Sequence, residues 1–146
     1  MYKKAYIPQE EKVHEVSETD LPPSARKILL LEDDPELAAL LEDHLKSQGF
    51  LVSYVKSGVE GLKRVMMGDF DIILCDMMMP NLSGDMFYLA VERTKPQLCK
   101  RFIFMTGHKG DPKIDAFIRK VRGLMLWKPF ELHDLQATIE AILKKG

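Results

Sequence analysis

Short, mainly apolar blocks alternate with longer amphipathic stretches from residue 27 to the end of the chain. In each amphipathic stretch the apolar residues recur at intervals of three and four, which is typical of helices with one buried face. Such alternation predicts an α/β fold, in which a parallel sheet carries helices on both faces through right-handed crossovers. The predicted strands are residues 27–31, 50–55, 71–75, 101–105 and 124–127, and the predicted helices are 35–45, 59–67, 85–94, 112–121 and 132–145.

The first 26 residues differ from this pattern. Residues 9–20 are polar and acidic, and the Pro22-Pro23 pair after them disfavours a helix. We therefore expect residues 1–26 to be a polar tail or linker and residues 27–146 to be the folded domain. The printed chain stops at the last predicted helix, so we expect no output domain after it.

Polar side chains follow four of the five predicted strands. Glu32 and Asp33 come after the first strand, Asp76 after the third, Thr106 after the fourth and Lys128 after the fifth. Because the carboxyl ends of parallel strands meet at one edge of the sheet, we expect these side chains to lie close together. Asp34 is also acidic, but it is predicted to cap the following helix, which begins at a proline.

This set of side chains indicates phosphoryl transfer. Three nearby carboxylates repel one another unless a cation joins them, and an all-oxygen site suits Mg²⁺. Asp76 is then a carboxylate nucleophile, with Lys128 and Thr106 placed to hold the oxygens of the transferred group. Each residue alone has an ordinary explanation, such as a solvated loop acid, a solvated lysine or a capping threonine. The hypothesis depends on the whole set.

Composition narrows the classes of function. The chain has 146 residues, of which 46% are hydrophobic, and its 21 basic and 22 acidic residues give a net charge of −1. This balance argues against a nucleic-acid surface, and no apolar stretch is long enough for a membrane span or a signal peptide. Cys75 and Cys99 lack metal-site spacing and form no disulfide framework, so the reducing cytosol is the expected compartment.

Four segments resemble the receiver domain of two-component response regulators. They are residues 27–34 (KILLLEDD), 71–84 (DIILCDMMMPNLSG), 105–107 (MTG) and 127–130 (WKPF). The resemblance implies a flavodoxin-like, doubly wound sheet with strand order 2-1-3-4-5. It also implies a phosphohistidine donor, namely a histidine kinase or a histidine phosphotransfer domain. Segment 106–112 and the acidic leader also resemble the C-terminal receivers of hybrid histidine kinases.

The same resemblance implies a role for individual residues. Asp76 would be the phosphoacceptor, and Thr106 and Lys128 would contact the phosphoryl group. Mg²⁺ would be bound directly by Asp33 and Asp76, through water by Glu32, and by the backbone carbonyl of Met78. The peptide bond between Lys128 and Pro129 would be cis.

One position departs from the family. Many receivers carry an aromatic residue three positions before the lysine, where it works with the threonine as a switch, and this chain has Met125 there. We expect a weaker response on the face formed by the fourth helix, fifth strand and fifth helix. A homodimer, if one forms, would use that face.

Three other functions agree less well with the sequence. A flavodoxin-like cofactor binder needs a phosphate-binding loop after the first strand, where the acids of residues 32–34 would repel phosphate. A phosphatase with an aspartyl nucleophile needs a general acid two residues later, where Met78 stands. A receiver-like scaffold that accepts no phosphate conflicts with the complete set of acids, threonine and lysine. The prediction is a phosphorylated switch that turns over no metabolite.

Overall fold

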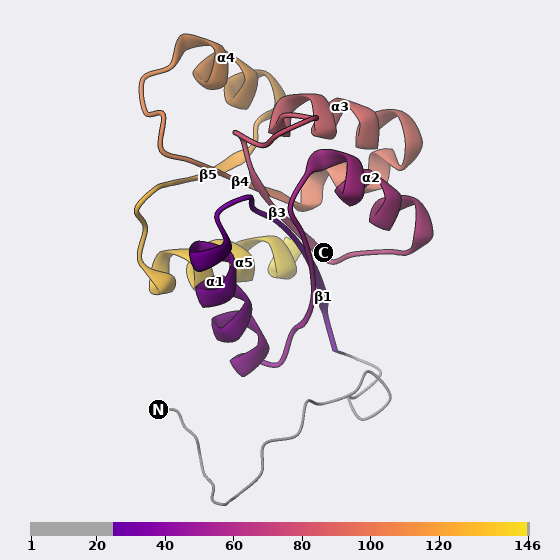
Figure 1. The fold of residues 1–146 in the computed structure, drawn as a ribbon, viewed down its shortest axis with the longest axis vertical. Coiled ribbons are helices and arrows are strands. Elements are labelled where there is room, and N and C mark those ends of the chain that lie inside the picture. The colour runs from indigo at the N-terminus through magenta and orange to yellow at the C-terminus, as the bar shows by residue number, and fades with distance from the viewer. Residues whose placement is uncertain (1–24, 146) are drawn as a thin grey trace, which may run out of the picture.

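The computed structural model describes residues 25–145, which form a five-stranded parallel sheet with helices on both faces (Figure 1). The strand order is β2-β1-β3-β4-β5, as the resemblance implied. The strands are β1 (Lys27–Leu31), β2 (Leu51–Val55), β3 (Ile72–Asp76), β4 (Phe102–Thr106) and β5 (Leu124–Trp127). The helices are α1 (Pro35–Ser47), α2 (Gly58–Met67), α3 (Gly84–Thr94), the 3-10 helix η2 (Pro96–Arg101), α4 (Pro112–Val121) and α5 (Leu132–Lys145).

The central strands are apolar along their whole length because both of their faces are buried. In β1, Leu29 and Leu31 pack into the core under α2, α3 and α4, whereas Ile28 and Leu30 pack into the core under α1 and α5. All four side chains are fully buried. Figure 1 shows the same division, with α1 and α5 on one side of the sheet and α2 and α3 on the other. None of the helices within residues 25–145 is long and apolar enough to cross a membrane.

The start of α1 follows the predicted signals. The Asp34 side chain accepts hydrogen bonds from the backbone amides of Glu36 at 3.0 Å and Leu37 at 3.4 Å, and Pro35 opens the helix. The helix is followed by Gly49 at φ 93°, a left-handed conformation that favours glycine. The cap at Asp34 starts α1 directly after the acids, so the β1–α1 connection that carries them is short.

Several boundaries differ from the prediction by one or two residues. Strands β3 and β4 each run one residue further, to Asp76 and Thr106, because these residues still pair with Met105 and Trp127 on the neighbouring strands. Helix η2 was not predicted. The predicted tail is untested, because residues 1–24 lie outside the part of the chain that the structure describes.

The first residue of α3 lies directly against the end of β3. A Cβ atom on Gly84 would lie 2.8 Å from the carbonyl oxygen of Asp76 and 2.8 Å from the Cα atom of Met77. The amide of Gly84 also donates to the carbonyl of Met77 at 3.0 Å. Only glycine allows this approach, so the β3–α3 loop depends on it.

Replacing Gly84 tests this close packing. We expect Gly84→Ala to lower the free energy of unfolding by about 1–3 kcal/mol, because the added methyl group forces backbone atoms apart. Urea denaturation measures the change. Gly68→Ala is the matched control, because a Cβ atom there meets nothing within 4 Å. An equal loss of stability in both variants would contradict the interpretation.

Candidate functional site

Three carboxylates converge at the carboxyl edge of the sheet. Strands β1 and β3 are neighbours, with Leu31 paired to Cys75, so the residues that follow them come side by side. Carboxylate oxygens of Glu32, Asp33 and Asp76 all lie within 4.8 Å of one another. Glu32 is fully buried and Asp76 is 4% exposed, whereas Asp33 is exposed. Like charges are thus held together at the boundary between the core and the solvent.

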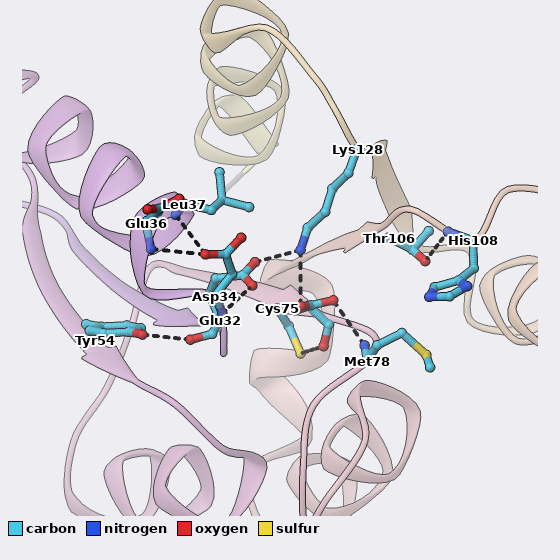
Figure 2. A network of polar contacts seen from close by, with 11 residues as sticks. Glu32, Asp34, Glu36, Leu37, Tyr54, Cys75, Met78, Thr106, His108 and Lys128 are labelled. Atoms are coloured by element: carbon cyan, nitrogen blue, oxygen red, sulfur yellow. Dashed lines mark hydrogen bonds and ion pairs between the residues drawn. The ribbon is translucent and has the colours of Figure 1, made fainter.

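Lys128 supplies the positive charge within this cluster (Figure 2). Its Nζ atom lies 2.8 Å from Oε1 of Glu32 and 3.1 Å from Oδ2 of Asp76, and it donates a hydrogen bond to each. The lysine reaches the site because its backbone amide donates to the carbonyl of Thr106 at 2.8 Å, which continues the pairing of β5 with β4. One ammonium group therefore bridges two carboxylates that are themselves close together.

The environment changes the protonation of both partners in this bridge. Burial raises the pKa of Glu32 from its ordinary value of 4.5 to about 7, and the charge of Asp76 adds to the effect. Hydrogen bonds from Lys128 and the amide of Asp34 partly oppose it. Burial lowers the pKa of Lys128, but its hydrogen bond to Glu32 and the charge of Asp76 outweigh burial and raise it above its usual value. Lys128 thus stays charged, whereas Glu32 takes up a proton easily.

Backbone amides hold the remaining carboxylate oxygens. The amide of Asp34 donates to Oε2 of Glu32 at 3.0 Å, and the amide of Met78 donates to Oδ1 of Asp76 at 3.0 Å. Each oxygen can accept a further bond, because a carboxylate has about four acceptor sites. The side chain of Asp76 is therefore fixed in direction, yet it keeps capacity for another group.

The other predicted site residues differ in burial and in the contacts that they make. Thr106 is fully buried, and its Oγ1 accepts a hydrogen bond from the amide of His108 at 3.0 Å. Figure 2 shows Thr106 on the side of Lys128 away from Glu32. The Met78 side chain is 50% exposed. Met125 is outside the carboxylate cluster, paired with Phe104 in the sheet and packed against the core under α2, α3 and α4.

The donor set fits a hard divalent cation. The three acids offer only oxygen atoms, and the exposed Asp33 leaves one side of the cluster open to solvent. Mg²⁺ prefers oxygen ligands and keeps several waters, which such an open site allows. Lys128 bonds to Glu32 and Asp76, and no hydrogen bond to the side chain of Asp33 is found among residues 25–145, so Asp33 stays available to a cation.

Sequence reasoning missed one residue that contacts the site. The hydroxyl of Tyr54, on β2, donates to the backbone carbonyl of Glu32 at 2.8 Å (Figure 2). Burial raises the pKa of Tyr54, and the charges of Glu32 and Asp33 raise it further. Its signal in the sequence was slight: a tyrosine near the end of a strand that pairs with the acid-bearing strand.

Comparison with known proteins places this geometry in a family. Residues 28–140 match the model of the response regulator receiver domain. The transcriptional activator IrlR of Burkholderia pseudomallei is 29% identical over 126 residues, and the match covers 82% of this chain and 51% of that protein. The sensor kinase CckA of Brucella abortus is 32% identical over 139 residues, covering 94% of this chain and 14% of that protein. The chain thus spans about half of the one relative and a small part of the other.

Solved structures show the same fold. The receiver domain of a sensor histidine kinase from Pseudomonas aeruginosa PAO1, with magnesium coordinated in its active-site cleft, is 25% identical with a TM-score of 0.72. That match covers 83% of this chain and 99% of the other. The chemotaxis response regulator CheY4 of Vibrio cholerae is 24% identical with a TM-score of 0.73, covering 82% of this chain and 99% of the other.

The raised pKa of Glu32 predicts how stability depends on pH without metal. Between its usual value of 4.5 and about 7, the folded protein binds a proton at Glu32 that the unfolded chain releases. This contribution to the free energy of unfolding is present below about pH 4.5 and lost as pH rises through about 7. We expect Glu32→Gln to flatten that decline, measured by urea denaturation with a metal chelator across this range. Glu92→Gln, on the exposed surface of α3, is the control and should keep the wild-type slope.

Proposed function

This chain belongs to the family of response regulator receiver domains, and we propose that Asp76 is the residue on which it accepts a phosphoryl group. A receiver domain is a switch module of two-component signalling. The observation that carries the proposal is the environment of Asp76, whose carboxylate lies among two other acids and beside Lys128. Asp76 is the last residue of the buried strand β3 and keeps slight exposure to solvent. Glu32 is fully buried, and Asp33 lies in an exposed loop.

The proposed reaction uses the groups that surround Asp76. A carboxylate oxygen of Asp76 forms a bond to phosphorus while the bond from phosphorus to the donor histidine nitrogen breaks, and the imidazole leaves with the electron pair. Lys128 and the hydroxyl of Thr106 donate to the phosphoryl oxygens. The amide of Met78 holds the carboxylate in direction. Mg²⁺, held by Asp33, Asp76 and the carbonyl of Met78 and through water by Glu32, would neutralise the charge that the phosphoryl group brings.

The donor is a phosphohistidine protein in this proposal, because receivers work with histidine kinases or phosphotransfer partners. Similarity to a sensor kinase over 94% of the chain supports a receiver linked to a kinase. In that arrangement residues 1–26 are the linker and residues 27–146 are the receiver in the cytoplasm. The domain turns over no metabolite, and neither nucleic acid nor membrane insertion is part of the function. A dimer would use the face of α4, β5 and α5.

Acetyl phosphate with Mg²⁺ tests the acceptor and the metal site together. We expect wild type to gain the mass of one phosphoryl group and Asp76→Asn to gain none, because the amide is not a nucleophile. Asp33→Ala should abolish the phosphorylation that depends on Mg²⁺. Asp85→Asn is the matched control, because Asp85 bonds to Ser83 outside the carboxylate cluster, and it should be phosphorylated like wild type. Equal labelling of Asp76→Asn and wild type would refute the assignment of Asp76.

The lifetime of the phosphoryl group depends on the residues around it. Met78 and His108 each follow a site residue by two positions, and the thioether of Met78 positions water poorly. We expect slow self-dephosphorylation in wild type. Met78→Asn should accelerate it by about tenfold, since an amide can orient an attacking water and this difference amounts to about 1.4 kcal/mol of barrier. Decay of the phosphorylated protein, followed by intact mass, gives both rates. Met86→Asn, at another exposed methionine, should decay at the wild-type rate.

A further inference from the structure

Tyr54 links the second strand to the acid-bearing loop. It pairs with Leu30 in the sheet, and its ring packs at the edge of the core under α1 and α5. Its hydroxyl reaches beyond the end of β1 and donates to the carbonyl oxygen of Glu32 at 2.8 Å (Figure 2). The ring and the hydroxyl therefore make separate contacts, one with the core and one with the loop.

Among residues 25–145, no backbone amide donates to the carbonyl of Glu32, because the β1–β2 pairing ends there. The amide of Glu32 still donates to the carbonyl of Val55 at 3.2 Å, as the last rung between the two strands. In a continued parallel ladder, the amide of Ser57 would donate to the carbonyl of Glu32. Ser57 instead begins α2, where its side chain accepts from the amide of Glu60 at 3.3 Å. Tyr54 supplies the donor that the ladder no longer provides.

This hydrogen bond acts on the peptide group that joins Glu32 to Asp33. A fixed carbonyl sets the plane of that peptide, and the plane sets the direction in which the Asp33 backbone leaves the strand. The side chain of Glu32 is already fixed, because its carboxylate accepts hydrogen bonds from Lys128 and from the amide of Asp34. For the side chain of Asp33, no comparable hydrogen bond is found among residues 25–145, so its orientation depends more on the backbone.

We propose that Tyr54 is a positioning residue for the metal site, because its hydroxyl orients the Glu32–Asp33 peptide so that both acids face Asp76. The inference rests on the proposed function, since it concerns Mg²⁺ bound by these acids. Residues that support metal ligands typically change metal affinity by 10–100-fold when replaced. Tyr54 contacts the backbone of a ligand rather than its carboxylate, so a smaller effect is expected.

Tyr54→Phe removes the hydroxyl and keeps the ring, so it tests the hydroxyl alone. In the full chain we expect Mg²⁺ to bind about three- to tenfold more weakly, measured by titration with amide chemical shifts as the readout. The maximal rate of phosphorylation at saturating Mg²⁺ should stay near that of wild type, because the variant changes no group that touches the phosphoryl group. In metal-free protein the nitrogen shift of the Asp33 amide should move, because that nitrogen is bonded to the carbonyl carbon that loses its hydrogen bond.

Tyr88→Phe is the matched control, because it removes a hydroxyl from a buried tyrosine in the aromatic cluster around Phe102 and Phe104. It should leave Mg²⁺ affinity unchanged. Unchanged Mg²⁺ affinity in Tyr54→Phe would overturn the inference, whether or not the melting temperature falls. If Tyr54 were only structural, its replacement would lower stability and leave Mg²⁺ affinity unchanged. Failure of the proposed metal site is distinguishable, because wild type and Asp33→Ala would then respond to Mg²⁺ alike.

Discussion

The structure depends on the convergence of three carboxylates within 4.8 Å of one another at the end of a buried sheet. Two of these acids, Glu32 and Asp76, are almost completely buried, and a buried charge is costly. Without metal, the negative charge of the carboxylates is reduced in two ways. Lys128 bridges Glu32 and Asp76, and a pKa of about 7 lets Glu32 take up a proton near neutrality. The site therefore favours added positive charge, which a divalent cation would supply.

The fold brings these three carboxylates together. The acids come from strands that are far apart in the sequence but adjacent in the sheet, because the crossover from β2 returns the chain to the other side of β1. The loop after β1 is short, and Asp34 ends it by capping α1. The loop after β3 is held by the contact of Gly84 with Asp76 and Met77. Few of these parts can move alone, so the acids stay together despite their repulsion.

Much of this arrangement was predictable from the sequence, and the rest was not for physical reasons. Apolar blocks of strand length, an Asp-Pro helix start and acids after neighbouring strands are local signals, and they gave the fold and the predicted site residues. The strand ends at Asp76 and Thr106 were placed one residue early, because their pairing partners lie on other strands. The contact between Lys128 and Glu32 joins residues 96 positions apart. The hydroxyl of Tyr54 replaces a backbone bond whose absence becomes evident only in three dimensions.

Lys128 and Thr106 connect the acids to the rest of the sheet. Under the proposed function, a phosphoryl group on Asp76 would compete with Glu32 for Lys128. Its oxygens would also accept from the hydroxyl of Thr106, whose Oγ1 could still accept from the amide of His108. Thr106 ends β4 and Lys128 directly follows β5, so a shift of either residue would pass to these strands. There it meets Met125, packed beside Phe104. A flexible thioether would adapt to a movement of Thr106 with little difference in energy, and only a difference in energy between two states shifts their populations. Under the proposed function, different residues would therefore set the chemistry of the acids and the strength of the output, and Met125 would limit only the output.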